Sequence, residues 1–310
     1  MKILIGYDSS TTADAALDDL KSAGLPERAE AIVISVAEVW LPPENVEEAD
    51  SAAKNNYVEK LTGKHHQKGS KAVGEAETFA RHARERLKKS FPGWKISAEG
   101  TFGSPAQEII IKANEMKADL IVVGSHGRSA VGRFLIGSIS QKVLTAAACS
   151  VRVARGSVEV DPVPPRVIVG FDGSAGANAA IESVIARNWR EQSEFRLIAA
   201  ADPTTPSALG RFVPPIAEWV EEANQGEHAW IEKLAAPALQ KLSDAGLAAS
   251  LCIYDGNPKN VLVEETERWH ADSIFVGANR YGSRSERFLI GSVSAAIAAR
   301  AHCLVEIVRA

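Results

Sequence analysis

The hexapeptide RFLIGS occurs twice in this chain, at residues 133–138 and again at 287–292. The likeness extends on both sides, from VVGSHGRSAVGRFLIGSIS at 122–140 to VGANRYGSRSERFLIGSVS at 276–294. A repeat of this length rarely arises by chance, so we interpret the chain as a duplicated domain. Its 310 residues suffice for two domains of ordinary size, each able to bury a core.

Other segments recur in the same order in the two halves. The pairs are KILIGYDSS (2–10) with RVIVGFDGS (166–174), VISVAE (33–38) with LIAAAD (197–202), LIVVG (120–124) with SIFVG (273–277), and CSVRVA (149–154) with CLVEIV (303–308). Between the halves, GSVEVDPVPP has the proline and acidic content of a linker. We therefore predict a first domain at 1–155, a linker at 156–165 and a second domain at 166–310.

The first half alternates short apolar runs with helical patterns. Strands are predicted at 3–6, 31–36, 94–101, 119–123 and 150–154, and helices at 11–23 (capped by Thr11 or Thr12), 104–116 and 138–148. A polar stretch opens at Pro42 and runs to about Ser90, with helical spacing over 73–87 and a charged first part that we expect to be partly mobile. This alternation predicts an α/β fold with a parallel sheet covered by helices on both faces.

Composition narrows the class of protein. Hydrophobic residues make up 45%, charged residues 24%, and the net charge is −4, which is typical of a soluble globular protein and does not favour nucleic acid or an anionic membrane as partner. Cys149, Cys252 and Cys303 include no C-x-x-C pair, which argues against a disulfide scaffold or zinc site. With no visible signal peptide and no apolar run of membrane-spanning length, we expect a cytoplasmic protein.

The loop after the strand at 119–123 is rich in glycine and leads directly into a helix that begins at Ser138. Its glycines are Gly124, Gly127, Gly132 and Gly137. Glycine lets the backbone approach a ligand closely, and the first N–H groups of a helix lack internal partners, so this arrangement favours an anion site. The alternative is an ordinary strand-to-helix turn, with the nearby Arg128, Arg133 and Lys142 as a solvated rim.

Topology would bring a second segment to this loop. In an open parallel sheet, ligands bind beyond the carboxyl ends of the strands, where the strand order reverses. Asp8 and Gly124 end the first and fourth predicted strands, so we expect one site to be lined by Asp8, Ser9, Gly124, Gly127, Gly137 and Ser138. Asp8 and Ser138 also fit a turn or helix-cap role, but Asp8 has a duplicate in Asp172, which favours the site.

The spacing G-x2-G-x9-G-[S/T] from Gly124 to Ser138 resembles that of the universal stress protein family, specifically its ATP-binding branch. The resemblance covers both halves and implies two tandem Rossmann-like (adenine nucleotide alpha hydrolase-like) domains, each with a five-stranded, mostly parallel sheet flanked by helices. It also implies that the main chain of Val36 meets the adenine and that Asp8 lies near the base and ribose. Gly124 and Gly127 would approach the ribose and phosphates.

The same resemblance places the triphosphate at the start of the next helix. Gly137, Ser138 and the following amides, from Ile139 onward, would hold the phosphates, and Ser140 would join them. Two further loop residues are candidates: Arg128 as a basic group near the phosphates, and His126 as a contact to phosphate or ribose. A solvent-facing histidine is the favoured alternative for His126.

The second half departs from this pattern. The interval from Gly277 to Gly291 is one residue longer than its counterpart, the place of Gly127 falls on Arg280 or Tyr281, and Glu286 replaces Gly132. The residues that remain are Asp172, Gly277, Gly291 and Ser292. We therefore expect the first domain to bind ATP better than the second.

Catalytic signatures are missing from the sequence: there is no Walker A motif, no SGGxDS loop and no Ser/His/Asp grouping. We therefore predict an ATP-binding regulatory module with little or no turnover. The alternatives are a slow ATPase, nucleotidyl transferase or self-phosphorylating protein that uses hydroxyls of 137–140, and a nucleotide-free structural protein. Magnesium is the natural companion of a triphosphate, but the sequence predicts no dedicated metal site.

Members of the family commonly dimerise along the last strand. We expect the two halves to pair in this way within one chain, through 150–154 and 303–308, and leave open a further homodimer and an unknown protein partner. Antiparallel pairing would set Arg152 near Glu306. As exposed residues, these two charges are predicted to contribute little.

Overall fold

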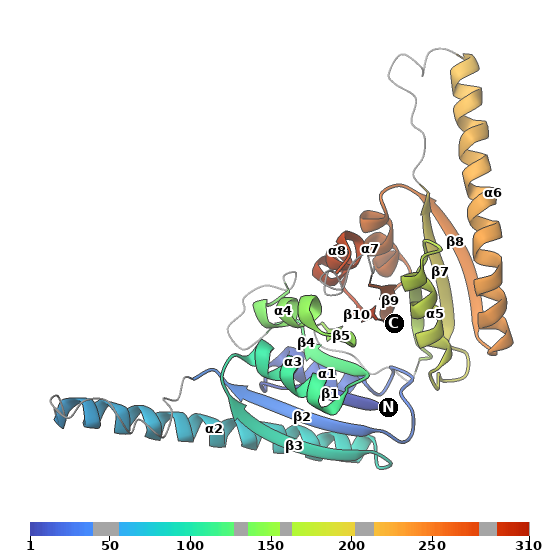
Figure 1. Ribbon diagram of the computed structural model, residues 1–310. Coiled ribbons are helices and arrows are strands. Elements are labelled where there is room, and N and C mark those ends of the chain that lie inside the picture. Colours follow the sequence, from blue (N-terminus) through green and yellow to red (C-terminus); the bar gives the residue numbers. More distant parts are fainter. Residues whose placement is uncertain (40–55, 127–135, 156–162, 202–213, 279–289, 310) are drawn as a thin grey trace.

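The computed structural model describes residues 1–39, 56–126, 136–155, 163–201, 214–278 and 290–309 (Figure 1). The N-terminal half contains β1 (Lys2–Gly6), α1 (Thr11–Asp19), β2 (Glu30–Ala37), α2 (Asn56–Ser90), β3 (Lys95–Phe102), α3 (Pro105–Met116), β4 (Leu120–Gly124), α4 (Ser138–Ala146) and β5 (Ser150–Ala154). The C-terminal half repeats this order with β6 (Arg166–Gly170), α5 (Ala175–Ile185), β7 (Glu194–Ala201), α6 (Pro214–Asp244), β8 (Ala248–Asp255), α7 (Pro258–Arg268), β9 (Ser273–Gly277), α8 (Ser292–Arg300) and β10 (Leu304–Val308).

The described strands form one ten-stranded sheet in the order β3-β2-β1-β4-β5-β10-β9-β6-β7-β8. Neighbouring strands are parallel within each half, and the central pair, β5 with β10, is antiparallel. The register sets Val151 opposite Ile307, Arg152 opposite Glu306 and Val153 opposite Val305. The predicted α/β class, the five parallel strands of each half and the internal pairing through the last strands are thus confirmed.

A shared core joins the two halves. On one face of the sheet, a single cluster of buried side chains contains Val143 and Val153 from the first half together with Ile297 and Val305 from the second. On the other face there are two clusters: one packs α1 and α2 and also includes Leu304 of β10, and the other packs α5 and α6 of the second half. The strands are apolar on both faces because helices cover both faces.

The helix boundaries differ from the sequence-based expectations at several points. The N-cap of α1 is Ser10, whose hydroxyl accepts from the N–H of Ala13 at 3.2 Å, so the prediction of Thr11 or Thr12 was wrong. That helix ends at Asp19 instead of continuing to 23. Helix α2 begins at Asn56, well before the predicted spacing, and the polar stretch 40–55 lies outside the described residues.

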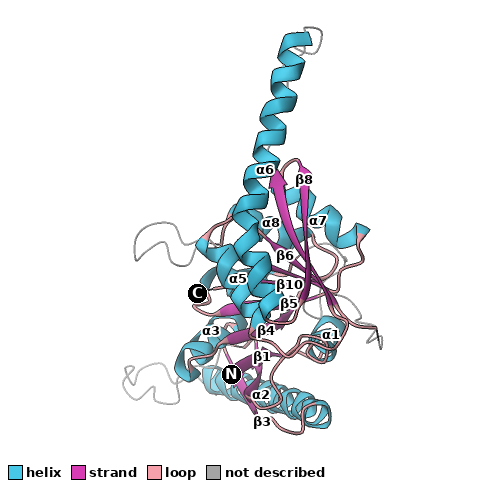
Figure 2. Ribbon diagram, turned by 90° about the vertical axis from the view of Figure 1, so that its right-hand side faces the viewer, coloured by secondary structure: helices cyan, strands magenta, loops and turns pink. Residues whose placement is uncertain are grey.

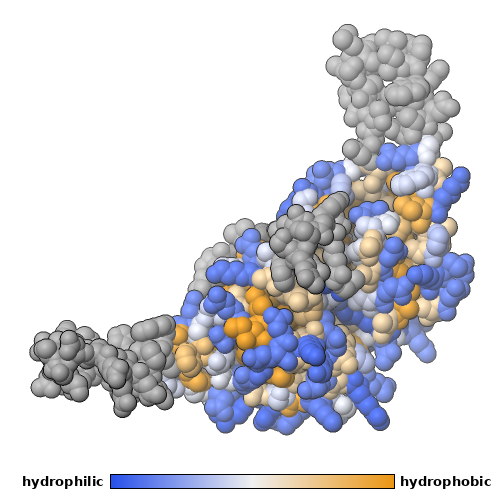
Figure 3. All heavy atoms as spheres, in the orientation of Figure 1, coloured by the Kyte–Doolittle hydropathy of each residue, from blue (hydrophilic) through white to orange (hydrophobic). Residues whose placement is uncertain are grey.

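Helices α2 and α6 are the longest of those described and run along the outer strands of their halves. Figure 1 shows α2 extending beyond β2 and β3 on one side and α6 beyond β7 and β8 on the other, and Figure 2 shows the same projection of α6 from the side. In Figure 3 hydrophilic residues cover most of the visible face, with smaller hydrophobic groups between them. Within the described residues, every helix is too short or too polar to cross a bilayer.

Candidate functional site

A cavity of about 390 Å³ lies beyond the carboxyl ends of β1, β2 and β4. This is the switch point of the first half, because β2 lies on one side of β1 and β4 on the other. Its volume falls within the range of about 300–1,000 Å³ that small-molecule sites occupy. The predicted site residues that line it are Asp8, Val36, Gly124, His126, Ile139 and Ser140.

Asp8 both lines the cavity and shapes the turn after β1. Its Oδ1 accepts a hydrogen bond from the N–H of Ser10 at 3.0 Å, so the turn role weighed from the sequence is also correct. Asp172 makes the same contact to Ser174 at 3.0 Å. Ser9, between Asp8 and Ser10, has a left-handed backbone (φ 59°) and is not among the described residues that line the cavity.

Val36 presents its main chain to the cavity. The carbonyl of Ile34 accepts from Tyr7 on the β1 side at 2.9 Å, and the carbonyl of Ala37 accepts from Gly103 on the β3 side at 3.0 Å. Because the polar groups of successive strand residues alternate in direction, the N–H and C=O of Val36 point the same way as those of Ile34. They therefore face the space beyond the end of β1, where the edge of a planar base can be hydrogen-bonded.

Gly124 is required by close packing. A Cβ atom at this position would lie 2.6 Å from Thr12 Oγ1 and 2.8 Å from the Thr12 carbonyl carbon. At the equivalent Gly277, a Cβ atom would lie 2.1 Å from the carbonyl carbon of Gly176. The glycine lets the start of α1 or α5 approach the strand end, and this packing requirement was not predicted from the sequence.

The start of α4 carries main-chain donors beside the cavity. The first intrahelical bond runs from Gln141 to the carbonyl of Gly137 at 2.9 Å, so the preceding amides of residues 138–140 have no place in that ladder. The amide of Gly137 itself donates to the carbonyl of Ser125 at 2.6 Å. The N-cap is Gly137, so the cap role considered for Ser138 was wrong; Ser138 is the exposed first residue of the helix.

Ser140 connects this helix to the end of β4. Its hydroxyl is buried and donates to the carbonyl of Gly124 at 2.6 Å. Ser294 donates to the carbonyl of Gly277 at 2.8 Å in the second half. The hydroxyl therefore ties the first turn of α4 to the end of β4, and the contribution that Ser140 can offer a ligand is its main-chain amide.

His126 is half-buried and lines the cavity, so the solvent-facing interpretation was wrong. Its Nδ1 lies 2.9 Å from the hydroxyl of Ser125, and its Nε2 is buried without a hydrogen-bond partner among the described residues. Burial, and after it the positive charge of Arg155, lower the pKa of this imidazole below its ordinary 6.5. When Ser125 donates to Nδ1, the proton of the neutral ring lies on Nε2.

The middle of the predicted loop lies outside the described residues. Gly127 and Arg128, like Gly132 and Arg133, belong to this part of the chain. The exposed position of Lys142 on α4 agrees with the solvated rim considered for the basic residues. No three His, Cys, Asp or Glu side chains in the described parts of the chain come together as a group that would hold a metal ion.

Helix α2 supplies cavity residues that sequence reasoning missed. The residues it contributes are Ala72, Glu75, Ala76 and Phe79, opposite the end of β2. Tyr7 is a further missed residue; its hydroxyl donates to Asp14 Oδ1 at 2.8 Å, and burial followed by Asp14 raises its pKa to about 12. Arg86 of α2 pairs with Asp14, and with Asp18 at 3.1 Å. The helical spacing at 73–87 predicted a helix here but gave no sign of which face covers the cleft.

The second half has a smaller cavity, about 140 Å³, at the equivalent place. It is lined by the predicted Asp172, Gly277, Gly291 and Ser292. The buried positions of α2 and α6 follow the same spacing: Ala76, Ala80, Ala83 and Leu87 in α2; Ile231, Ala235, Ala238 and Leu242 in α6. Ile231 thus stands where Ala76 lines the first cavity, and the described lining of the second cavity includes no residue of α6.

Comparison with known proteins shows what this arrangement resembles. The model of the universal stress protein family matches residues 1–155 and 165–309. A universal stress protein of Methanocaldococcus jannaschii is 40% identical over 75 residues, which cover 24% of this chain and 44% of that protein. One of Mycobacterium tuberculosis is 28% identical over 178 residues, covering 56% of this chain and 54% of the relative. The chain thus spans about half the length of these curated relatives.

Two solved structures share the fold along nearly the whole chain. A universal stress protein from Archaeoglobus fulgidus superposes with a TM-score of 0.57 at 18% identity, covering 99% of this chain and 96% of the other. A functionally unknown protein from Pseudomonas aeruginosa gives a TM-score of 0.58 at 13% identity, covering 99% and 92%. At these identities the likeness supports the tandem fold and leaves the ligand to be argued from the site.

Proposed function

The chain belongs to the universal stress protein family, and on that basis we propose that its N-terminal half binds ATP as a nucleotide-responsive regulatory module with little or no turnover. The observation that carries the proposal is the cavity of about 390 Å³, in which a main-chain edge, a carboxylate and the start of a helix meet. We retain the division into domains at 1–155 and 166–310, and a cytoplasmic location, as parts of this proposal.

Each end of the nucleotide has a matching part of the cavity. Val36 offers main-chain groups to the adenine, and the apolar side chains of Ala76 and Phe79 line the space opposite. Asp8 is placed to accept from the ribose hydroxyls. Around the phosphates, the amides at the start of α4 are donors suited to a multiply charged anion, and the half-buried ring of His126 lines the same cavity. Roles for Gly127 and Arg128 in this loop remain predictions.

The burial and hydrogen bonding of the Ser125 and Ser140 hydroxyls favour binding of the nucleotide over its turnover. Ser125 pairs with His126, as a nucleophile pairs with a base, but it is only 1% exposed. Ser140 donates to the carbonyl of Gly124 and is buried as well. Both hydroxyls are therefore poorly placed to act as nucleophiles, and Ser138, which is exposed at the start of α4, is the hydroxyl that the turnover alternative would need. Magnesium would enter together with the triphosphate and not through a preformed group of protein ligands.

The test is a calorimetric titration of the full chain with ATP, combined with assay of the nucleotide released on denaturation. Ile139 lines the first cavity and Val293 lines the second at the equivalent position, which provides a matched pair of variants. We expect Ile139→Glu to abolish ATP binding, because it sets a negative charge beside the phosphates, and Val293→Glu to preserve it. A silent titration of the wild type, or equal binding by the Ile139→Glu variant, would contradict the proposal.

A further inference from the structure

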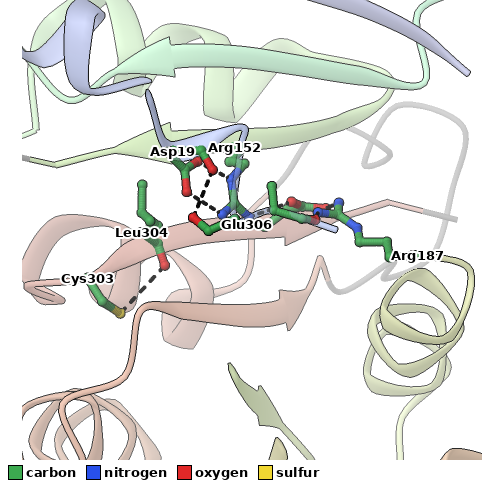
Figure 4. Close-up of polar contacts among 8 residues, drawn as sticks. Asp19, Arg152, Arg187, Cys303, Leu304 and Glu306 are labelled. Atoms are coloured by element: carbon green, nitrogen blue, oxygen red, sulfur yellow. Dashed lines mark hydrogen bonds and ion pairs between the residues drawn. The ribbon is translucent and has the colours of Figure 1, made fainter. Parts of the chain in front are cut away.

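The central strand pair contains two buried charges directly opposite each other. Arg152 of β5 and Glu306 of β10 are 1% and 0% exposed, so the sequence-based expectation of weak, exposed charges was wrong. Arg152 Nη1 donates to Glu306 Oε2 at 3.1 Å (Figure 4). Buried charges affect the stability of the fold strongly, because a buried charge without an oppositely charged partner is destabilising.

Each of these two residues also has a further oppositely charged partner. Arg152 Nη2 donates to Asp19 Oδ1 of α1 at 2.7 Å. Glu306 accepts from Arg187, which follows α5 and whose Nη1 reaches across to the carbonyl of Ala23 at 2.7 Å. The four side chains therefore form a row, Asp19–Arg152–Glu306–Arg187, in which the charges alternate (Figure 4).

The alternation depends on pairing unlike halves. If two copies of β5 paired in the same register, Arg152 would face a second Arg152, and the row would contain two adjacent cations. If two copies of β10 paired, two buried carboxylates would face each other. Like charges directly opposite on neighbouring strands are destabilising, and burial reduces the screening that water would provide.

The apolar contacts beside these charges do not distinguish a β5–β10 pair from a pair of two like strands. The flanking pairs, Val151 with Ile307 and Val153 with Val305, are apolar on both sides and would fit a pair of like strands equally well. The charge order is thus the feature of the described strand pair that differs between correct and incorrect pairing.

We propose that this charged row selects the partner of each last strand: β5 accepts the β10 edge of this chain and rejects a second copy of itself. Pairing between chains through like last strands, β5 with β5 or β10 with β10, is thereby disfavoured. The proposal stands independently of nucleotide binding. In this proposal the opposite charges of Glu306 and Arg152 determine which last strands pair when the two halves assemble.

The test imitates a β5–β5 contact inside the full chain. Glu306→Arg places a cation opposite Arg152, and a simultaneous Arg187→Gln removes the second cation nearby. The matched control is Arg187→Gln/Glu306→Gln, which has no charge at either position. We expect the like-charged variant to unfold at lower urea concentration, with at least a tenfold larger ratio of unfolded to folded protein than the control at the same urea concentration.

A second background separates charge from size. Both variants are remade with Arg152→Gln while Asp19 is kept, so that the residue at 306 no longer faces a cation and an arginine there has a carboxylate in the row to pair with. The difference between the two variants should then disappear or reverse. An equal penalty in both backgrounds would mean that arginine is simply too large at 306, and the proposal would fail. If the like-charged chain does not fold at all, recovery of folded protein in the second background supports the proposal, and failure in both overturns it.

Discussion

Arg155 and Arg309 occupy equivalent positions after β5 and β10, and each caps a helix of the opposite half. The guanidinium of Arg155 donates to the carbonyl of Ala298 in the last turn of α8, and that of Arg309 donates to the carbonyl of Leu144 in the last turn of α4. A cation at this end of a helix satisfies carbonyls that lack internal partners. Helix α4, which begins beside the cavity of about 390 Å³, is therefore held at its other end by the C-terminal half.

Replacing Arg309 should loosen that connection. Arg309→Met removes a largely buried charged donor and leaves the carbonyls of Leu144 and Cys149 without their partner. We expect a loss of about 2 kcal/mol in the free energy of unfolding, as for hydrogen bonds of charged groups. Urea unfolding of the full chain measures it, and an unchanged midpoint would show that the cap contributes nothing to stability.

His126 should make stability depend on pH. Its pKa in the folded protein lies below the ordinary 6.5, so the unfolded chain binds the proton more readily as the pH falls below that value. The stability that neutral His126 contributes is therefore fully present above about pH 6.5, and it is lost as the pH falls through the pKa of the folded protein. We expect the His126→Gln variant to lose less stability than the wild type between about pH 7.5 and 5.5. Urea midpoints at both pH values provide the comparison, and parallel losses would count against it.

Tyr7 should titrate late and help to hold α2 over the cavity. Its pKa of about 12 predicts that one of the four tyrosines ionises well above the ordinary value of 10 in an absorbance titration. Because the folded pKa is raised, this tyrosine stabilises the fold fully below about pH 10 and loses its contribution as the pH rises toward about 12. Tyr7→Phe should remove the late titration and cost about 1 kcal/mol through the lost hydrogen bond to Asp14. Persistence of the late step would assign it to another tyrosine.

Gly124 should not tolerate even one added methyl group. Gly124→Ala would push Cβ against the main chain of Thr12, and we expect a destabilisation of about 1–3 kcal/mol from overpacking. Gly74, on the exposed face of α2, is the matched control, since a Cβ atom added there would meet no atom within 4 Å. Gly74→Ala should instead stabilise by about 0.5–1 kcal/mol, because alanine is the better helix former. Similar effects of both substitutions in thermal or urea unfolding would contradict the packing argument.

The fold could be predicted from local sequence patterns because each pattern occurs in both halves of the chain. Short apolar runs ending at Gly6, Val123 and Ala154 predict buried parallel strands, and the repetition of each run fixes the domain order. The central pairing was anticipated from the family resemblance. The length of α2 was missed because its first part is polar and carries no apolar periodicity until about Val73; the rest of that helix is set by contact with β3.

The candidate site was only partly readable from the sequence. Asp8 and Gly124 were brought together by topology alone, since the ends of parallel strands meet at one edge of a sheet. Their local roles were not readable: the turn made by Asp8 and the contact between Gly124 and Thr12 involve neighbours that no motif specifies. The burial of Arg152 was missed for a similar reason, because Asp19 and Arg187 are distant in sequence.

The antiparallel β5–β10 pair in the middle of the sheet determines where the two cavities lie. Because the strands of the two halves run in opposite directions, their carboxyl ends, and with them the two clefts, open at opposite edges of the molecule. A protein that docks over one mouth is turned away from the other. The described connection between the two cavities therefore runs through the shared core and the β5–β10 pair, with Arg155 and Arg309 each holding a helix of the opposite half.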